Sequence, residues 1–254
     1  MRILMTNDDG ITSYGIKALM KELCKEHELI VIAPDRERSA TGHALTLHKP
    51  LRVKDYDSGF PNTNAFHTTG TPTDCVKLAL CSLYSLDDID LIITGINHGP
   101  NLGADILYSG TVNAAIEGAI YSIPSIAMSL TKGEKDLNNF DNAAKFLAKF
   151  LKKLPDLNIP EHTILNINYP PGIEPDMAKV RVTVLGKRMY CDYYEKREDP
   201  RGRIYYWLSG DPIEEGEAPD TDVTAVSNGL ISVTPIHFRL TDEPLIESLK
   251  KHLE

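Results

Sequence analysis

The chain contains 254 residues, of which 42% are hydrophobic and 25% are charged. These proportions are typical of a globular protein with a large apolar core, and they exclude the disordered, collagen-like and coiled-coil classes. The 27 basic and 36 acidic residues leave a formal net charge of −9, so we expect no binding of a nucleic-acid polymer or of an anionic membrane.

Short apolar runs alternate with segments of helical periodicity through the first two thirds of the chain. The predicted elements of this part are, in chain order, a strand at residues 2–6, a helix with Ile16, Leu19, Met20 and Leu23 on one face, a strand at 28–33, a helix at 71–84, a strand at 90–94, a helix at 111–121, a strand at 125–129, a helix with Ala143, Leu147, Phe150, Leu151 and Leu154 on one face, and a strand at 163–168.

Strands that lack polar alternation and are separated by helices indicate a parallel sheet covered on both faces. The expected fold class is therefore α/β, with a Rossmann-like, doubly wound and mostly parallel sheet. In such sheets ligands bind outside the carboxyl ends of the strands. Residues with a chemical role should thus follow the strands directly.

The pattern changes after about residue 170. Extended segments are predicted at residues 180–185 and 202–208, and between them lies the charged, aromatic stretch MYCDYYEKREDPRGR. We interpret this stretch as a β-hairpin arm or an oligomer contact, since Tyr and Arg are frequent in interfaces, although a solvated hairpin fits it as well. A strand at residues 230–234 and a terminal helix at residues 242–253 complete the chain. We expect one domain over residues 1–254, with a core sandwich at 1–170 and a hairpin and C-terminal oligomerisation extension at 171–254.

The four cysteines form no CxxC pair and no zinc-finger spacing, which favours a reduced, intracellular setting. The N-terminal apolar run is short and is followed by two aspartates, so it is not typical of a signal peptide. No apolar run approaches the roughly 18 residues that a membrane-spanning helix needs. We therefore expect a cytoplasmic protein without a membrane partner.

Polar residues collect where three of the predicted strands end. Asp8 and Asp9 follow the first strand, and Ser39 lies in the polar stretch after the second. Asn97 lies in the glycine-rich run after the strand at 90–94. Two carboxylates, a hydroxyl and a carboxamide form an all-oxygen set, which suits Mg²⁺ or Mn²⁺ better than zinc. Taken singly, each residue also fits an ordinary turn, cap or loop, so the metal-site hypothesis depends on their convergence at one rim.

The segment Ser109, Gly110 and Thr111 opens the helix predicted at residues 111–121. A helix N-terminus has unpaired N–H groups and partial positive charge, which bind phosphate readily, and Gly110 lets an anion approach the backbone. Ser109 is equally a natural N-cap. The run GINHGPNLGAD is neither a Walker A motif nor a GxGxxG fingerprint, so it does not indicate nucleotide binding by that route.

Histidines are candidates for a general acid that protonates a leaving alkoxide. His43, His67, His98 and His237 each qualify by residue type, but a lone histidine is more often a satisfied polar residue. No GxSxG elbow is visible, so hydrolysis by acyl transfer is not expected.

The sequence closely resembles the SurE family, the survival-protein nucleotidases. The matching stretches cover nearly the whole chain: MRILMTNDDGITSYGIKAL, VIAPDRERSATGHALTL, TGTPTDCVKLAL, ITGINHGPNLGADILYSGTVNAAIEGA and SVTPIHFRLT. The resemblance implies a Rossmann-like, metal-dependent phosphatase of nucleoside 5′- and 3′-monophosphates, which in some members also trims short polyphosphate. It further implies a homodimer or homotetramer, because the hairpin and terminal helix resemble arms that the family exchanges between subunits.

The resemblance also implies the site residues. Its metal ligands match Asp8, Asp9, Ser39 and Asn97, which would hold one divalent ion, Mg²⁺ or Mn²⁺, in each subunit. Its phosphate-binding segment matches Ser109, Gly110 and Thr111.

The expected reaction is the hydrolysis of a nucleoside monophosphate by direct attack of water, with Asp8 or Asp9 as general base, because no residue is an obvious covalent nucleophile. Two alternatives stay open. One is a non-catalytic sensor module that binds metal and nucleotide at the same rim. The other is a Rossmann-like glycosyltransferase, for which the sequence shows no separate acceptor domain.

Overall fold

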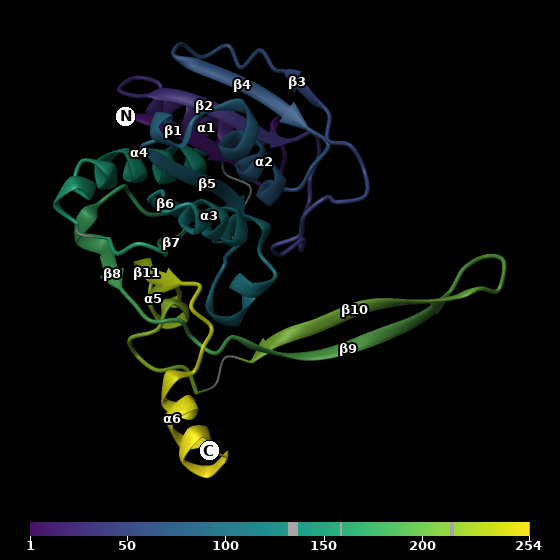
Figure 1. Cartoon of the computed structure of the whole chain (residues 1–254). Helices are drawn as coiled ribbons and strands as arrows, with labels where there is room; N and C mark the ends of the chain where they lie inside the picture. Colours follow the sequence, from purple (N-terminus) through teal and green to yellow (C-terminus); the bar gives the residue numbers. More distant parts are fainter. Residues whose placement is uncertain (132–136, 158, 214–215, 254) are drawn as a thin grey trace.

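A computed structural model of the chain describes residues 1–131, 137–157, 159–213 and 216–253 (Figure 1). Within these residues, one nine-stranded sheet has the order β3-β4-β2-β1-β5-β6-β7-β11-β8. Its strands are β1 (Arg2–Thr6), β2 (Glu28–Pro34), β3 (Val53–Asp55), β4 (Thr63–Thr68), β5 (Leu91–His98), β6 (Ser125–Leu130), β7 (Thr163–Tyr169), β8 (Val180–Val182) and β11 (Ile231–His237). The helices are α1 (Tyr14–Leu23), α2 (Pro72–Leu78), α3 (Gly110–Ile120), α4 (Asn138–Leu151), α5 (Asp222–Ser227) and α6 (Glu243–Leu253).

The sheet is mostly parallel, which confirms the predicted α/β class. Strands β4, β2, β1, β5, β6 and β7 all run in one direction. Strand β3 pairs antiparallel with β4 at one edge, and β11 pairs antiparallel with β7 near the other. The sequence pattern did not predict β3 and β4, because their residues are mostly polar; β3 is the exposed edge strand, and β4 next to it is only partly buried.

Both faces of the sheet are buried, and β1 shows why its sequence is a continuous apolar run. Ile3 and Met5 point toward the layer that contains α1 and α4, while Leu4 points toward the layer that contains α2 and α3. Since successive side chains of a strand alternate between faces, a strand covered on both sides needs apolar residues at every position. The two helix layers thus explain the predicted pattern.

The order of the strands reverses at β1. From β1 the chain builds outward through β2 and β4 on one side, and then returns to add β5, β6 and β7 on the other. The crevice between the carboxyl ends of β1 and β5 is therefore the topological switch point, where doubly wound sheets bind ligands.

Strand β5 continues beyond the predicted end at Thr94. Its pairing with β6 shifts register between Thr94 and Asn97, and then resumes at Asn97 and His98 opposite Ser129 and Leu130. The glycine at residue 95 favours a loop, but hydrogen bonds to β6 keep the backbone extended. Asn97 consequently lies on the last part of a strand instead of in the loop that follows it.

The predicted hairpin is also present. Strands β9 (Met189–Glu198) and β10 (Ile204–Ile213) pair antiparallel along their length and project from the body as a long ribbon (Figure 1). Helix α6 is amphipathic in sequence but has no buried residue. The short helix α5 was not predicted, since six residues are too few for a clear helical period. None of the helices in the described residues is long and apolar enough to cross a membrane.

Helix α1 approaches the end of β5 so closely that residue 15 has no room for a side chain. A Cβ at Gly15 would lie 2.0 Å from the carbonyl oxygen of Ile96. We expect Gly15→Ala to lower the free energy of unfolding by about 2–3 kcal/mol, because two pieces of backbone must separate to admit the methyl group. Denaturant unfolding checks this result. Tyr14→Ala, at an adjacent side chain that is 58% exposed, should change stability by less than about 0.5 kcal/mol. Equal stability of the Gly15→Ala variant and the parent would contradict this packing.

Candidate functional site

A cavity of about 380 Å³ opens at the carboxyl ends of the central strands. Its lining residues are Asp8, Asp9, Glu37, Ser39, Ala40, Asn97, His98, Pro100, Asn101, Asp105, Tyr108 and Ser109. The structure thus brings together all four predicted metal ligands, although they come from three segments far apart in the sequence. One of the three predicted phosphate-binding residues, Ser109, lines the same cavity.

The turn after β1 is held by a buried asparagine. The Asn7 Nδ2 donates hydrogen bonds to the carbonyl of Gly10 at 3.0 Å and to the Ser13 hydroxyl at 2.7 Å. Its Oδ1 accepts from the backbone N–H of Gly10 at 3.2 Å. These bonds close the turn that carries Asp8 and Asp9, whose side chains both line the cavity.

The two carboxylates have poor access to water. Burial raises the pKa of Asp8 to about 6, even though the Thr111 hydroxyl donates to its Oδ1 at 2.7 Å and opposes the rise. Burial also raises the pKa of Asp9, against the effect of the His98 backbone N–H, which donates to its Oδ2 at 3.1 Å. The nearby charge of Glu37 raises the pKa of Asp9 further. A cation at this site would stabilise the charged form of both groups.

The loop that carries Ser39 is tied to the rim at two points. The backbone N–H of Arg38 donates to the carbonyl of Asp8 at 2.7 Å. The backbone N–H of Gly42 donates to the carbonyl of Tyr108 at 3.0 Å. The Ser39 hydroxyl donates to Glu37 Oε1 at 2.6 Å and keeps its own lone pairs. The loop is therefore held against the end of β1 at one point and against the segment just before α3 at the other.

The oxygen atoms of the predicted metal set fit a hard divalent cation. Asn97 uses its Nδ2 to donate to the carbonyl of Gly99 at 2.8 Å, and its Oδ1 makes no hydrogen bond within the described residues. One carboxylate oxygen of Asp8 and one of Asp9 likewise make no hydrogen bond within the described residues. In the described part of the chain, no three or more His, Cys, Asp and Glu side chains form a metal-binding group. The predicted set of metal ligands does not require such a group, because hydroxyl, amide and water oxygens can complete a Mg²⁺ or Mn²⁺ site.

The N-terminus of α3 lies against Asp8. Ser109 is the N-cap, and its Oγ accepts from the N–H of Val112 at 3.1 Å. A Cβ at Gly110 would lie 3.1 Å from the Cβ of Asp8, so only glycine lets the helix come this close without a shift. Thr111 is fully buried, and its hydroxyl is engaged with Asp8 and does not line the cavity.

The four histidines that were candidates for a general acid lie in four different environments. His98 lines the cavity, while His67 lies in β4. The His43 Nε2 lies 2.7 Å from Glu117 Oε2, outside the cavity lining. His237 lines a larger cavity of about 510 Å³ at the opposite end of the sheet, between the start of β7 and the end of β11. Only His98 is therefore near the predicted metal ligands.

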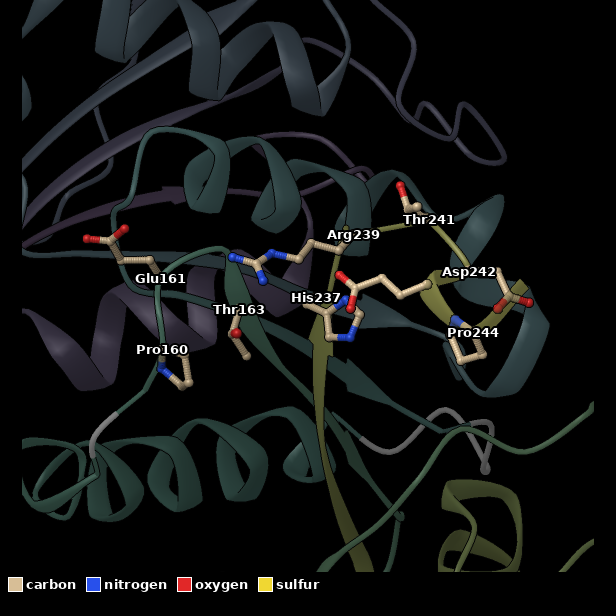
Figure 2. Close-up of a pocket in the computed structure, with 9 residues that line it drawn as sticks. Pro160, Glu161, Thr163, His237, Arg239, Thr241, Asp242 and Pro244 are labelled. Carbon is tan, nitrogen blue, oxygen red and sulfur yellow. The ribbon is translucent and has the colours of Figure 1, made fainter. Parts of the chain in front are cut away.

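Figure 2 shows that larger cavity, with Arg239 and His237 near its centre and Glu161 and Asp242 at its sides. It contains none of the residues predicted to bind metal or phosphate. Its position also differs from the ligand-binding edge of a doubly wound sheet. The smaller cavity is thus the candidate site on chemical grounds, although the other has the greater volume.

Sequence reasoning assigned no role to four polar residues of the lining, Glu37, Asn101, Asp105 and Tyr108. Asn101 is held firmly, because its N–H donates to Asn168 Oδ1 at 2.9 Å and its carbonyl accepts from both Asn166 and Asn168. The sequence contained a signal for these buried hydrogen bonds of Asn101. Two asparagines in the otherwise apolar strand β7 indicate a buried polar partner. Glu37 gives no such signal, since it is one of several charges in DRERS.

A buried carboxylate joins the Ser39 loop to the helices behind the site. The Glu117 side chain is 3% exposed and accepts from Lys77 Nζ, in addition to its contact with His43. Burial alone would raise the pKa of Glu117, but hydrogen bonds from His43 and Lys77 outweigh it and lower the pKa. Because His43 follows Ser39 in the same loop, this cluster fixes the far end of that loop.

Comparisons with known proteins show which proteins the whole chain is similar to. The family model described as survival protein SurE matches residues 3–192. The chain is 49% identical to the 5′-nucleotidase SurE of Pelotomaculum thermopropionicum, over 100% of this chain and 96% of that protein. It is 50% identical to the 5′-nucleotidase SurE of Gloeobacter violaceus, over 96% and 92%. The crystal structure of the SurE protein from Aquifex aeolicus matches with a TM-score of 0.83 and 40% identity, over 99% of each chain.

The Glu117 cluster predicts a pH-dependent loss of stability. Since the pKa of folded Glu117 lies below its ordinary value of 4.5, its contribution to stability is present above pH 4.5 and disappears as the pH falls through the folded pKa. Its partners are partly exposed, so we expect Glu117→Gln to cost only about 1–2 kcal/mol at pH 7 and less below pH 4.5. Urea unfolding at several pH values measures both quantities.

The matched control is Glu247→Gln, at a glutamate whose side chain is 77% exposed and pairs with Lys250. This variant should unfold like the parent at every pH. A loss in Glu117→Gln that stays constant from pH 7 to pH 4 would show that charge does not cause it.

Proposed function

The chain belongs to the family of survival protein SurE, and from this premise we propose that it is a 5′-nucleotidase that hydrolyses nucleoside 5′-monophosphates to nucleoside and phosphate with the help of a divalent metal ion. The observation that supports the proposal most strongly is the convergence of four oxygen-bearing side chains at the switch point of the sheet, beside the N-terminus of α3. Proteins half identical to this chain along nearly its whole length carry the name 5′-nucleotidase.

In the proposed site, Asp8, Asp9, Ser39 and Asn97 hold one Mg²⁺ or Mn²⁺. When bound, the ion supplies positive charge that offsets the charge of the phosphate and makes a nearby water a stronger acid. The side-chain oxygens that make no hydrogen bonds are those available for this role. The charge of the ion would offset the burial of the two carboxylates.

The protein residues then divide the work of hydrolysis. A carboxylate of the pair Asp8 and Asp9 accepts the proton of the attacking water, since both lie on the cavity surface. The first N–H groups of α3 have no partner within the helix, and together with the Ser109 hydroxyl they hold the nonbridging oxygens of the phosphate. Charge on these oxygens is part of the transition state, so fixed donors there lower the barrier.

The proposal extends to the wider substrate range and assembly that the family resemblance implies. Nucleoside 3′-monophosphates and short polyphosphate present the same terminal phosphate to the site. We further propose a homodimer or homotetramer, because the projecting hairpin exposes apolar and aromatic side chains such as Tyr194, Trp207 and Leu208 to solvent. A panel of phosphomonoesters, assayed with several divalent ions and with a chelator, tests the activity, and absence of phosphate release from AMP with every ion would overturn the nucleotidase function and favour the sensor function.

Asp9→Asn should abolish metal-dependent release of phosphate. The amide keeps the shape of the side chain but removes the charge and the proton acceptor, so we expect kcat for AMP to fall at least 100-fold, as for loss of a general base. Phosphate release in the presence of Mn²⁺ measures the effect, and circular dichroism checks that the fold is kept. Asp156→Asn, at an exposed aspartate outside the cavity lining, should retain the parental rate. Full activity of Asp9→Asn would remove Asp9 from the mechanism.

Ser109→Ala should raise KM or lower kcat without loss of metal binding. The variant loses both a proposed phosphate donor and the N-cap of α3, and the lost cap alone costs about 1 kcal/mol of stability. The matched control is Thr221→Ala, which removes the corresponding cap of α5 outside the cavity lining. Steady-state kinetics on AMP and calorimetry with Mn²⁺ compare the two. If both variants have the parental kcat/KM, the phosphate-binding role of Ser109 is wrong.

A further inference from the structure

Tyr108 is a large aromatic side chain that stands exposed on the wall of the candidate site. It is 69% exposed, whereas Ile106 and Ser109 beside it are 8% and 7% exposed. Its hydroxyl makes no hydrogen bond within the described residues. The ring therefore contributes little to the core, and its surface is available to a ligand in the cavity.

The backbone holds this ring close to the proposed phosphate position. The N–H of Tyr108 donates to the carbonyl of Asp105 at 3.0 Å, and its carbonyl accepts from Gly42 at 3.0 Å. The next residue, Ser109, caps α3. Consecutive Cα atoms lie about 3.8 Å apart, so the ring begins one residue away from the group that would hold the phosphate. That spacing suits the sugar and base of a nucleotide whose phosphate contacts Ser109.

The other side chains of the lining offer less apolar surface to a ligand. His98 is the other aromatic ring among them and is also exposed, but its ring is smaller and more polar, and it packs against Phe140 with ring centroids 5.9 Å apart. Asp105 is neutralised, because Arg188 Nε and the Tyr190 hydroxyl both donate to its Oδ2. The remaining residues are mainly short and polar. Tyr108 is thus the apolar face in the lining best placed to meet a planar group.

We propose that the nucleobase of the substrate stacks on the ring of Tyr108, and that this contact makes the enzyme prefer nucleotides to phosphate esters that lack a base. The inference rests on the nucleotidase function proposed above and names the group that recognises the base. Stacking tolerates every base, because each has a π-face, so Tyr108 favours nucleotides as a class and does not select one base.

The test compares AMP with ribose 5-phosphate, which presents the same phosphate on the same sugar without a base. The parent protein should show the higher kcat/KM for AMP. Tyr108→Leu, which keeps an apolar side chain but removes the ring, should lower kcat/KM for AMP about tenfold, the size expected for one stacked base. Its kcat/KM for ribose 5-phosphate should stay within about twofold of the parent. Tyr108→Phe should behave as the parent on both esters, since the ring remains.

Leu107→Ala is the matched control, because Leu107 is 64% exposed and adjacent in sequence but does not line the cavity. It should leave both esters unaffected. Equal losses on AMP and ribose 5-phosphate in Tyr108→Leu, or no loss on AMP, would overturn the proposal. A changed oligomeric state of Tyr108→Leu in gel filtration would also overturn it, since the ring would then be a subunit contact.

Failure of the nucleotidase function itself gives a different result, because the parent then releases phosphate from neither ester. In that case calorimetric titration with AMP and with ribose 5-phosphate still tests whether the base stacks on Tyr108. AMP should bind more tightly than ribose 5-phosphate to the parent, and Tyr108→Leu should reduce this difference about tenfold. Equal affinities of the two ligands for the parent would contradict stacking on Tyr108.

Discussion

The burial of two adjacent carboxylates at the end of β1 is the constraint on which the rest of the site depends. Asp8 is only 6% exposed, and within the described residues no lysine or arginine forms an ion pair with Asp8 or Asp9. Hydrogen bonds from Thr111 and from the His98 backbone offset part of the desolvation cost. They do not remove it, since both pKa values stay raised. The divalent cation of the proposed function would stabilise a site built this way.

The topology of the sheet explains why such a site can form here. At the switch point, β1 and β5 lie side by side, and the helices that follow them, α1 and α3, cover opposite faces of the sheet, which leaves a crevice at the carboxyl ends of the two strands. The loop that carries Ser39 forms part of the wall of this crevice. It is held at one end through the Asp8 carbonyl and at the other through His43 and the buried Glu117. The loop that would supply Ser39 as a ligand is thereby fixed to rigid elements at both ends, which limits the loss of conformational entropy on binding.

The two ends of the parallel sheet differ in chemistry as well as in position. The carboxyl end collects carboxylates, amides and a helix N-terminus in a modest cavity, while the opposite end has the larger cavity with mixed charges around Arg239 and His237. Volume alone would favour the second cavity. The chemistry of phosphate hydrolysis favours the first, because the two buried carboxylates, Ser39 and Asn97 lie there beside the N-terminus of α3.

Local sequence patterns determine much of the fold and of the ligand set. Continuous apolar strands between helices predict a parallel sheet with two covered faces, and the carboxyl ends of parallel strands must share one edge. The sequence by itself therefore places Asp8, Asp9, Ser39 and Asn97 together at that edge. The tertiary structure alone decided the edge strand β3 and its neighbour β4, the contact of Thr111 with Asp8, the pairing of His43 with Glu117 and the open position of Tyr108. Each of these depends on segments that lie tens of residues apart and meet only when the helices pack, and no local pattern encodes the partner of a side chain that distant contacts select.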